Sequence, residues 1–143
     1  MFGRKRVKPI DLKSLDQLKL LLTEGKPILI EFMQVGCRNC KIMDGIVTEL
    51  AEEYGGSAHV VKVDLGRVAG AVASFQVKAT PTFLLFGRPS LPTAKKKAKR
   101  QPAPAPEREQ QGPVVKWRGS GLVRKDVMTR ALESSGAVRA GSE

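Results

Sequence analysis

Two cysteines separated by two residues lie between a short apolar run and a segment with helical spacing. The apolar run covers residues 27–33, and the helical spacing covers residues 41–54. Cys37 and Cys40 are the only cysteines of the chain. These patterns predict a buried strand, a short turn and then an amphipathic helix. Both thiols are therefore expected at the start of a helix that follows a central strand.

The spacing of the cysteine pair is compatible with three interpretations. A structural zinc ion needs about four nitrogen or sulfur ligands, whereas the chain offers two thiols and the distant His59, so zinc would require dimerisation around the ion. Cysteines also serve as small buried apolar residues. The third interpretation is redox chemistry, because the N–H groups and the dipole at a helix start stabilise a thiolate. The order of strand, turn, Cys37 and helix is the one that redox chemistry needs.

The positive charge of the chain is concentrated in two segments. The 143 residues carry a net charge of +11, of which residues 1–8 supply four basic residues. Residues 87–113 contain seven basic residues, two acidic residues and six of the nine prolines. Such a composition cannot form a core, so it predicts a disordered loop. The remainder of the chain is nearly neutral and long enough for one domain with a core.

These boundaries give a predicted domain organisation. We expect a basic amino-terminal arm over residues 1–9 and a flexible tail over residues 134–143. A single domain is expected over residues 10–133, interrupted by the basic, proline-rich loop at 87–113. The loop predicts weak binding to a polyanion such as nucleic acid, an anionic membrane or an acidic protein, and the alternative is a loop that only aids solubility.

The sequence contains neither a transmembrane segment nor a recognisable secretory signal. No run reaches the roughly 20 apolar residues that span a bilayer, and Lys8, Pro9, Asp11 and Lys13 interrupt the region after the basic start. We therefore expect a cytoplasmic protein. A reducing compartment keeps a cysteine pair as thiols unless the pair is turned over.

Two charged residues of opposite sign interrupt predicted buried strands. Glu31 lies in the run 28–33, and Lys62 lies in the run 60–65. Burying an ionised carboxylate costs several kcal/mol, so Glu31 is expected to be paired or to have a raised pKa. The alternative is that Glu31 faces an exposed edge. The opposite signs favour a pair between Glu31 and Lys62.

Periodicity and turn residues predict the remaining elements. A leucine-rich helix is expected to end at Gly25, with Ser14 or Asp11 as its cap and its leucines in the core. A short helix is expected over residues 66–76. A carboxy-terminal helix is expected after Gly119, and its inward residues are predicted to be Val123, Val127, Met128, Ala131 and Leu132.

Further along the chain, a Thr-Pro peptide introduces another apolar strand. Proline is tolerated at the first residue of a strand. A cis form of the Thr80–Pro81 bond would be a specified feature, because only about 5% of such bonds are cis.

Together, these motifs resemble the thioredoxin family. The matching motifs are Ile28-Leu29-Ile30-Glu31-Phe32, Cys37-Arg38-Asn39-Cys40-Lys41, Val61-Lys62-Val63-Asp64 and Ala79-Thr80-Pro81-Thr82-Phe83-Leu84-Leu85-Phe86. The resemblance covers residues 10–86 and 114–133. It implies the α/β thioredoxin fold, a central mixed β-sheet flanked by helices, here with a disordered insertion before the last strand. It also implies a thiol-disulfide oxidoreductase that exchanges protein disulfides.

The resemblance implies catalytic roles for four residues. Cys37 would be the exposed nucleophilic thiol, and Cys40 would be the resolving thiol that releases the mixed disulfide. Glu31 stands where the family usually has a buried aspartate that helps to deprotonate the resolving thiol. Lys62 stands at the position of that acid's partner.

The substrate-binding residues implied by the resemblance are Gly36, Arg38, Thr80 and Pro81. Pro81 would be the cis proline that faces the cysteines, and the backbone of Thr80 would pair with an extended substrate segment. Gly36 replaces the family's tryptophan, which removes an apolar contact surface. Arg38 places a cation beside the sulfurs, so we hypothesise a lowered pKa for Cys37 and a more oxidising pair than in an ordinary thioredoxin.

The expected partners follow from this chemistry. They are disulfide-containing proteins and a recycling reductase or small thiol, and the chain is expected to be a monomer that needs no metal or organic cofactor. An alternative function is a binding module, or a redox-sensing adaptor, that uses the basic loop to dock on nucleic acid or an acidic protein.

Overall fold

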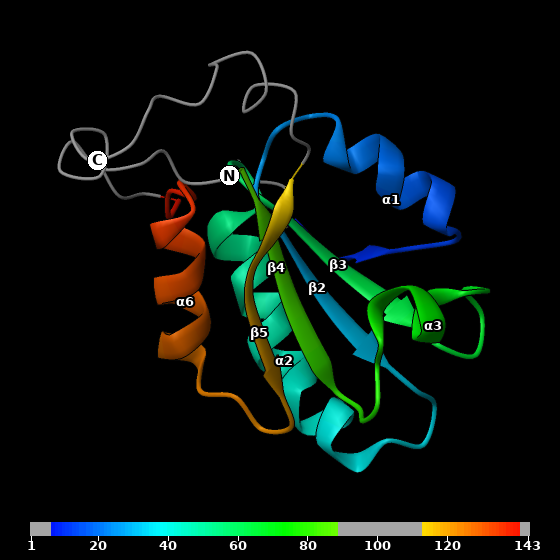
Figure 1. Cartoon of the computed structure of the whole chain (residues 1–143). Coiled ribbons are helices and arrows are strands. Elements are labelled where there is room, and N and C mark those ends of the chain that lie inside the picture. Colours follow the sequence, from blue (N-terminus) through cyan, green and yellow to red (C-terminus); the bar gives the residue numbers. More distant parts are fainter. Residues whose placement is uncertain (1–6, 89–112, 141–143) are drawn as a thin grey trace, which may run out of the picture.

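A computed structural model of the chain describes residues 7–88 and 113–140. Within these ranges, one mixed sheet has the strand order β1-β3-β2-β4-β5, and helices cover both of its faces (Figure 1). The elements along the chain are β1 (Ile10–Asp11), α1 (Leu15–Leu22), β2 (Ile28–Met33), α2 (Arg38–Tyr54), β3 (His59–Asp64), α3 (Ala71–Phe75), β4 (Thr82–Gly87), β5 (Val114–Ser120) and α6 (Lys125–Ser134). The predicted mixed sheet flanked by helices is confirmed.

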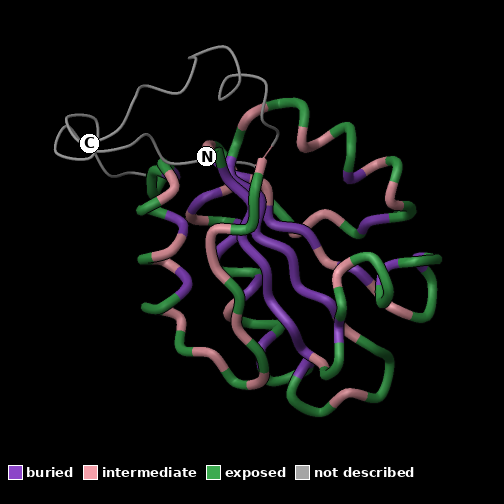
Figure 2. The backbone as a smooth tube through the Cα atoms, viewed as in Figure 1, coloured by how far each residue is buried: buried purple, intermediate pink, exposed green. Residues whose placement is uncertain are grey.

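Strand β2 lies at the centre of the sheet because it is apolar on both faces. It pairs in parallel with β3 and antiparallel with β4. All of its residues except Met33 are buried. A strand covered on both faces has a nearly continuous apolar sequence, as the run 28–33 indicated. Figure 2 shows this buried centre between helices that are exposed on their outer sides.

The two faces of the sheet are covered by different helices (Figure 1). Helices α2 and α6 pack against one face, where Leu29 and Phe83 meet Met43 and Met128. Helices α1 and α3 pack against the other face. The buried cluster on that second face contains Leu12, Leu18, Ile28, Ile30, Phe32, Val61, Val63, Val68, Ala71, Val77, Leu84 and Phe86.

Helix α2 begins at Arg38, three residues before the predicted start. Cys37 is its N-cap, and the Cys37 Sγ atom accepts a hydrogen bond from the Cys40 N–H group at 3.1 Å. This bond satisfies one of the N–H groups that a helix start leaves without an intrahelical partner. The helix ends at Tyr54, before Gly55, as the spacing predicted.

Helix α1 has the predicted Ser14 cap, whose Oγ atom accepts a hydrogen bond from the Gln17 N–H group at 3.2 Å. Leu18 is buried, but Leu20 is 69% exposed. At 3.6 residues per turn, neighbouring leucines cannot all face one side of a helix. The prediction that the whole leucine stripe belongs to the core is therefore wrong at Leu20.

Helix α6 shows a similar difference between prediction and structure. Met128 and Leu132 are fully buried, whereas Val127 is 39% exposed. Val123 and Ala131 pack partly buried against the core, as predicted. The inward face is therefore narrower than the predicted set of residues.

The segment after α6 is hydrogen-bonded to the end of α2 and to the turn that follows it, although the sequence predicted a flexible tail over residues 134–143. The Val138 N–H group donates to Ser57 Oγ at 2.7 Å, and the Ala140 N–H group donates to the Glu53 carbonyl at 2.6 Å. The predicted tail is therefore wrong for the residues up to Ala140. Its last three residues, 141–143, lie outside the described part of the chain.

Other predictions fall wholly or partly outside the described residues. These are the basic arm, of which residues 1–6 are not described, and the loop at 87–113, of which residues 89–112 are not described. Strand β1 was not predicted; it pairs in parallel with β3. None of the helices in the described ranges has the length and apolar character needed to cross a membrane.

Candidate active site

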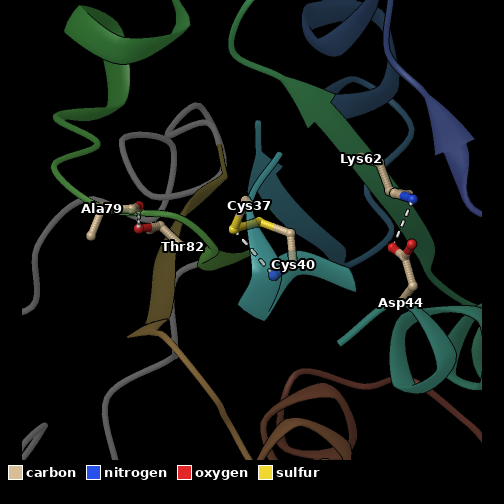
Figure 3. Close-up of a disulfide and its surroundings, with 6 residues drawn as sticks. All are labelled: Cys37, Cys40, Asp44, Lys62, Ala79 and Thr82. Atoms are coloured by element: carbon tan, nitrogen blue, oxygen red, sulfur yellow. Dashed lines mark hydrogen bonds and ion pairs between the residues drawn. A yellow bond between two sulfur atoms is a disulfide. The ribbon is translucent and has the colours of Figure 1, made fainter. Parts of the chain in front are cut away.

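Cys37 and Cys40 form a disulfide at the start of α2, with their α carbons 5.2 Å apart (Figure 3). The turn at residues 34–36 connects the end of β2 to the first cysteine. Cys37 is partly exposed and Cys40 is buried. Cys37 is therefore the more exposed of the two cysteines, and its role as the attacking thiol stays a prediction.

Backbone N–H groups at the helix start donate to the sulfur and to the carbonyl of Cys37. Besides the hydrogen bond from the Cys40 N–H group to Cys37 Sγ, the Lys41 N–H group donates to the Cys37 carbonyl at 3.3 Å. The helix dipole places partial positive charge at this end. Both features favour a negatively charged sulfur when the disulfide is reduced.

The loop before β4 lies at the end of the sheet where the chain leaves β2, because Thr82 pairs with Phe32. The Thr80–Pro81 bond in this loop is cis, and Figure 3 draws Ala79 and Thr82, on either side of that bond, together with the disulfide. Thr82 Oγ1 donates to the Ala79 carbonyl at 2.6 Å, which closes the loop on itself. Pro81 is buried, and the half-buried Thr80 precedes it. The cis peptide therefore lies at the same end of the sheet as the segment that leads from β2 to Cys37.

Glu31 is buried in the layer between the sheet and α2. It is 1% exposed, and it lies two residues from Leu29, which faces α2, because alternate residues of a strand share a face. Neither carboxylate oxygen has a hydrogen-bond partner among the described residues. Burial raises the pKa of Glu31 to about 7, while the charge of Lys62 lowers it and that of Asp44 raises it. Burial and a raised pKa were predicted; an exposed edge is excluded.

Lys62 does not form the predicted direct pair with Glu31. The two residues are neighbours in the β2–β3 register, but Lys62 Nζ donates to Asp44 Oδ1 at 3.0 Å (Figure 3). Burial lowers the pKa of Lys62, but the hydrogen bond and the charge of Asp44 raise it further, so the net shift is upward. Lys62 therefore acts on Glu31 through the electrostatic field of its charge, and the ion-pair partner of Lys62 is Asp44.

Asp44 is the residue of this site that the sequence interpretation missed. It lies four residues after Cys40 on α2, and residues four apart lie on the same side of a helix. That spacing was the available signal. A register prediction names the nearest backbone neighbour of Lys62 but does not fix the direction of its long side chain.

Gly36 and Arg38 lie on either side of the reactive cysteine at the surface. Gly36 has a φ of 87°, and a Cβ atom built on it would meet nothing within 4 Å. The positive φ favours glycine at this turn. Arg38, the first residue of α2, is exposed. A Cβ atom at Gly36, directly before Cys37, would therefore lie in open space.

His59 lies apart from the disulfide and forms a contact with a different residue. Its Nε2 atom is 2.9 Å from Glu24 Oε1. Within the described residues, no three histidine, cysteine, aspartate or glutamate side chains lie together as a metal site requires.

The comparison with protein families decides which family this site belongs to. The family model described as Thioredoxin matches residues 12–103. The chain belongs to the thioredoxin family. Its partly exposed first cysteine, its buried second cysteine and its cis proline are described below as parts of a thioredoxin-family chain.

Curated thioredoxins match about half of this thioredoxin-family chain. The chloroplastic thioredoxin Y of Oryza sativa subsp. japonica is 34% identical over 73 residues, which are 50% of this chain and 44% of that protein. Thioredoxin 1 of Chlorobaculum tepidum is 37% identical over 67 residues, 47% of this chain and 66% of that protein. The chain therefore spans less than half the length of the rice relative.

Solved thioredoxin structures confirm the fold of this thioredoxin-family chain over most of its length. The thioredoxin of Malassezia sympodialis superposes with a TM-score of 0.67 at 17% identity and covers 95% of this chain and 98% of its own. A mutant thioredoxin of Halobacterium salinarum gives a TM-score of 0.66 at 19% identity, over 94% and 96% of the two chains.

Proposed function

We propose that this thioredoxin-family chain is a thiol-disulfide oxidoreductase that exchanges protein disulfides through Cys37 and Cys40. The observation that carries the proposal is a disulfide at a helix start between a partly exposed cysteine and a buried one. A buried carboxyl without a partner among the described residues lies in the layer beneath the same helix. The two sulfurs and one proton acceptor are the groups that the exchange requires.

The first step is attack by the Cys37 thiolate on one sulfur of a substrate disulfide. The substrate S–S bond breaks, its other sulfur leaves as a thiolate, and Cys37 becomes joined to the substrate by a mixed disulfide. The N–H groups at the start of α2 stabilise the attacking thiolate.

The second step releases the substrate. The Glu31 carboxylate accepts the proton of the Cys40 thiol, and the resulting thiolate attacks Cys37 Sγ. The mixed disulfide breaks, the second substrate sulfur leaves as a thiolate, and the Cys37–Cys40 bond forms. The substrate disulfide has gained two electrons and the chain has lost two. A reductase or small thiol returns the chain to the dithiol state.

The roles proposed for Glu31 and Lys62 are supported by their surroundings. A general base is most effective when its pKa is close to the working pH, and burial raises the pKa of Glu31 to about 7. The positive field of Lys62 opposes that rise. Glu31 is therefore the proposed proton acceptor, and Lys62 the proposed modulator of its acidity.

The proposed substrate-binding surface combines Thr80, Pro81, Gly36 and Arg38. The backbone of Thr80 offers pairing groups to an extended segment, and Pro81 faces the disulfide. The open surface at Gly36 admits a partner that a tryptophan would block. We further propose that the Arg38 cation favours the reduced thiolate and makes the pair more oxidising, which a redox titration against glutathione measures.

The proposed partners are disulfide-containing proteins and a recycling reductase or small thiol. The monomeric state, the cytoplasmic location and weak polyanion binding by the loop at 87–113 stay predictions. The binding module and the redox-sensing adaptor remain the alternatives that the following experiment separates from an enzyme.

Reduction of insulin disulfides in the presence of dithiothreitol tests the proposed function. The parent chain is expected to accelerate the reaction, Cys37→Ser is expected to abolish the acceleration, and Cys40→Ser is expected to accumulate the mixed disulfide seen by mass spectrometry. Asp16→Asn, an exposed change on α1, is the control that keeps the parent rate. Parent-like turnover by Cys37→Ser would contradict the proposal. No turnover, with nucleic-acid binding at low salt that disappears on deletion of residues 95–100, would favour the binding module.

A further inference from the structure

We propose that Asp44 is a positioning residue that holds Lys62 away from Glu31 and thereby sets the pH at which Glu31 can accept the proton of Cys40. The catalytic meaning of this arrangement rests on the proposed function. The arrangement of the three charges does not, so it can be tested separately.

The contacts place Lys62 between two competing carboxylates. Lys62 sits beside Glu31 in the β2–β3 register, yet its Nζ atom lies 3.0 Å from Asp44 Oδ1. Figure 3 shows the Lys62 side chain directed to Asp44 on α2. Glu31 is left with both oxygens unpartnered among the described residues.

The burial of the two acids explains which one binds the lysine. The Asp44 side chain is half exposed, so its ionised form keeps much of its hydration. Glu31 is buried, and ionising it requires removal of the carboxylate from water. An ammonium group that can reach either acid therefore pairs with the acid that is already charged.

The charged surroundings of Glu31 are few. Lys62 comes from β3 and Asp44 comes from α2, and their charges are the ones that act on Glu31. From β4, the register neighbour is the apolar Phe83. Asp11 on β1 acts on Lys62. A change at Asp44 therefore reaches Glu31 in two ways, through the loss of its own negative charge and through the release of Lys62.

Release of Lys62 has a predictable direction. With the aspartate gone, the acids beside Lys62 in the sheet register are Glu31 on β2 and Asp11 on β1. An opposite charge within about 4–6 Å lowers the pKa of a carboxyl by about 1–3 units, so a lysine released toward Glu31 lowers the Glu31 pKa. Glu31 would then be ionised at lower pH and would be a weaker base. Each unit of change alters its ratio of ionised to protonated forms tenfold.

The direct test is the titration of Glu31 in the full oxidised chain by carbon-detected NMR of its carboxyl group. Asp44→Asn is expected to lower the Glu31 midpoint by about one pH unit or more. The matched control is Asp16→Asn, which removes one exposed carboxylate from α1 on the opposite face of the sheet and is expected to leave the midpoint unchanged. An unchanged midpoint in Asp44→Asn overturns the proposal.

A second pair of variants separates release of Lys62 from simple loss of a negative charge. Lys62→Met is combined with Asp44→Asn in a double-mutant cycle. The midpoint shift caused by Asp44→Asn is expected to be several-fold smaller when Lys62 is absent. Equal shifts in both backgrounds would show that Asp44 acts only through its own charge, and this result would overturn the positioning role.

The catalytic consequence has its own measurement. The rate at which Cys40 releases a preformed mixed disulfide is followed against pH, and Asp44→Asn is expected to move the acidic limb of this profile downward by the same interval as the Glu31 midpoint. A profile that stays in place while the midpoint moves would overturn the link to catalysis. Absence of turnover in the parent chain, with the midpoint shifts intact, would instead count against the proposed function.

Discussion

The two faces of the central sheet bury very different side chains. The face under α1 and α3 holds a buried cluster of aliphatic and aromatic residues and alanine. The face under α2 and α6 also has a large apolar cluster, but Glu31 and Lys62 lie on the same side, and Lys62 binds Asp44 of α2. One face buries apolar side chains, and the other also buries the carboxyl that we propose as the proton acceptor.

This difference separates the two faces by what they contribute, because one stabilises the fold and the other also buries an ionisable carboxyl. The apolar face gains roughly 25 cal/mol for each Å² of apolar surface removed from water. The face that contains Glu31 loses some folding free energy at high pH. Burial raises the pKa of Glu31 to about 7, because ionising a carboxyl away from water is unfavourable. The following changes test the contrast, from the largest expected effect to the smallest.

Removing a large side chain from the apolar face should destabilise the fold most. Phe32 is fully buried, and its ring centroid lies 5.1 Å from that of Phe75. Phe32→Ala is expected to lower the free energy of unfolding by about 3–5 kcal/mol, as measured by urea denaturation. Leu20→Ala, at an exposed position of α1, is the control and should change it little. A loss below about 1 kcal/mol for Phe32→Ala would show that the apolar face does not supply the larger share of the stability.

Removing the buried acid from the other face should increase the free energy of unfolding at high pH, whereas Phe32→Ala decreases it. The folded chain holds the Glu31 proton up to about pH 7, whereas the unfolded chain loses it near 4.5. Because the folded state binds more protons in this window, the stability of the parent falls as pH rises through it. Relative to the parent, Glu31→Gln should gain about 3 kcal/mol between pH 4 and pH 8.

The measurement for Glu31→Gln is a series of urea unfolding curves across that pH range. In the variant, position 31 should cause no loss of stability as pH rises. Any effect of the new amide on the free energy of unfolding should be the same at every pH. A constant difference between variant and parent would mean that Glu31 titrates normally, and the two faces would then be electrostatically alike.

The carboxy-terminal segment closes the face that holds the charges, and a single hydroxyl tests its contribution. Ser57 Oγ accepts from the Val138 N–H group at 2.7 Å and donates to the Val138 carbonyl at 3.0 Å. Ser57→Ala is expected to cost about 2 kcal/mol for two hydrogen bonds and to speed amide exchange at Val138. Ser74→Ala, at an exposed position on α3, is the control. Unchanged exchange at Val138 would refute the proposed role of this contact.

The cap of α1 should give the smallest effect. Ser14→Ala removes the acceptor of the Gln17 N–H group and is expected to cost about 1 kcal/mol. Ser14→Asp keeps an acceptor at the cap and should retain most of the stability by thermal denaturation. A loss as large as that of Phe32→Ala would show that the α1 side depends on local bonds more than on packing.

The strands and the main helix were predictable because their signals are local. The run 28–33 and the spacing after Cys40 identified β2 and α2, and the burial of Glu31 followed from its place in the run. Strand β1 has only two residues, so no periodicity marks it. Its formation depends on pairing with β3, which is a tertiary contact.

The contacts of long or exposed side chains were less predictable. The sequence placed Glu31 and Lys62 on neighbouring strands, but Lys62 pairs with Asp44 because that acid keeps its hydration when ionised. Val138 bonds to the Ser57 hydroxyl after α2, and Ala140 bonds to the Glu53 carbonyl in α2. Both contacts use backbone N–H groups of the carboxy-terminal segment, which carry no sequence signature. Sequence reasoning identified the cysteine pair, the cis proline and the buried acid. It did not identify the side-chain contact between Lys62 and Asp44.

The sulfur that caps α2 is also the atom that changes bonding partner in every proposed cycle. A thiolate at Cys37 is a strong acceptor for the Cys40 amide, and a disulfide sulfur is a weak one. The first turn of α2 should therefore tighten on reduction and loosen on oxidation. The amide proton of Cys40 becomes a built-in reporter, and its exchange with solvent should be slower in the dithiol state. The exchange rate of this amide proton would then report whether the Cys37–Cys40 pair is reduced or oxidised.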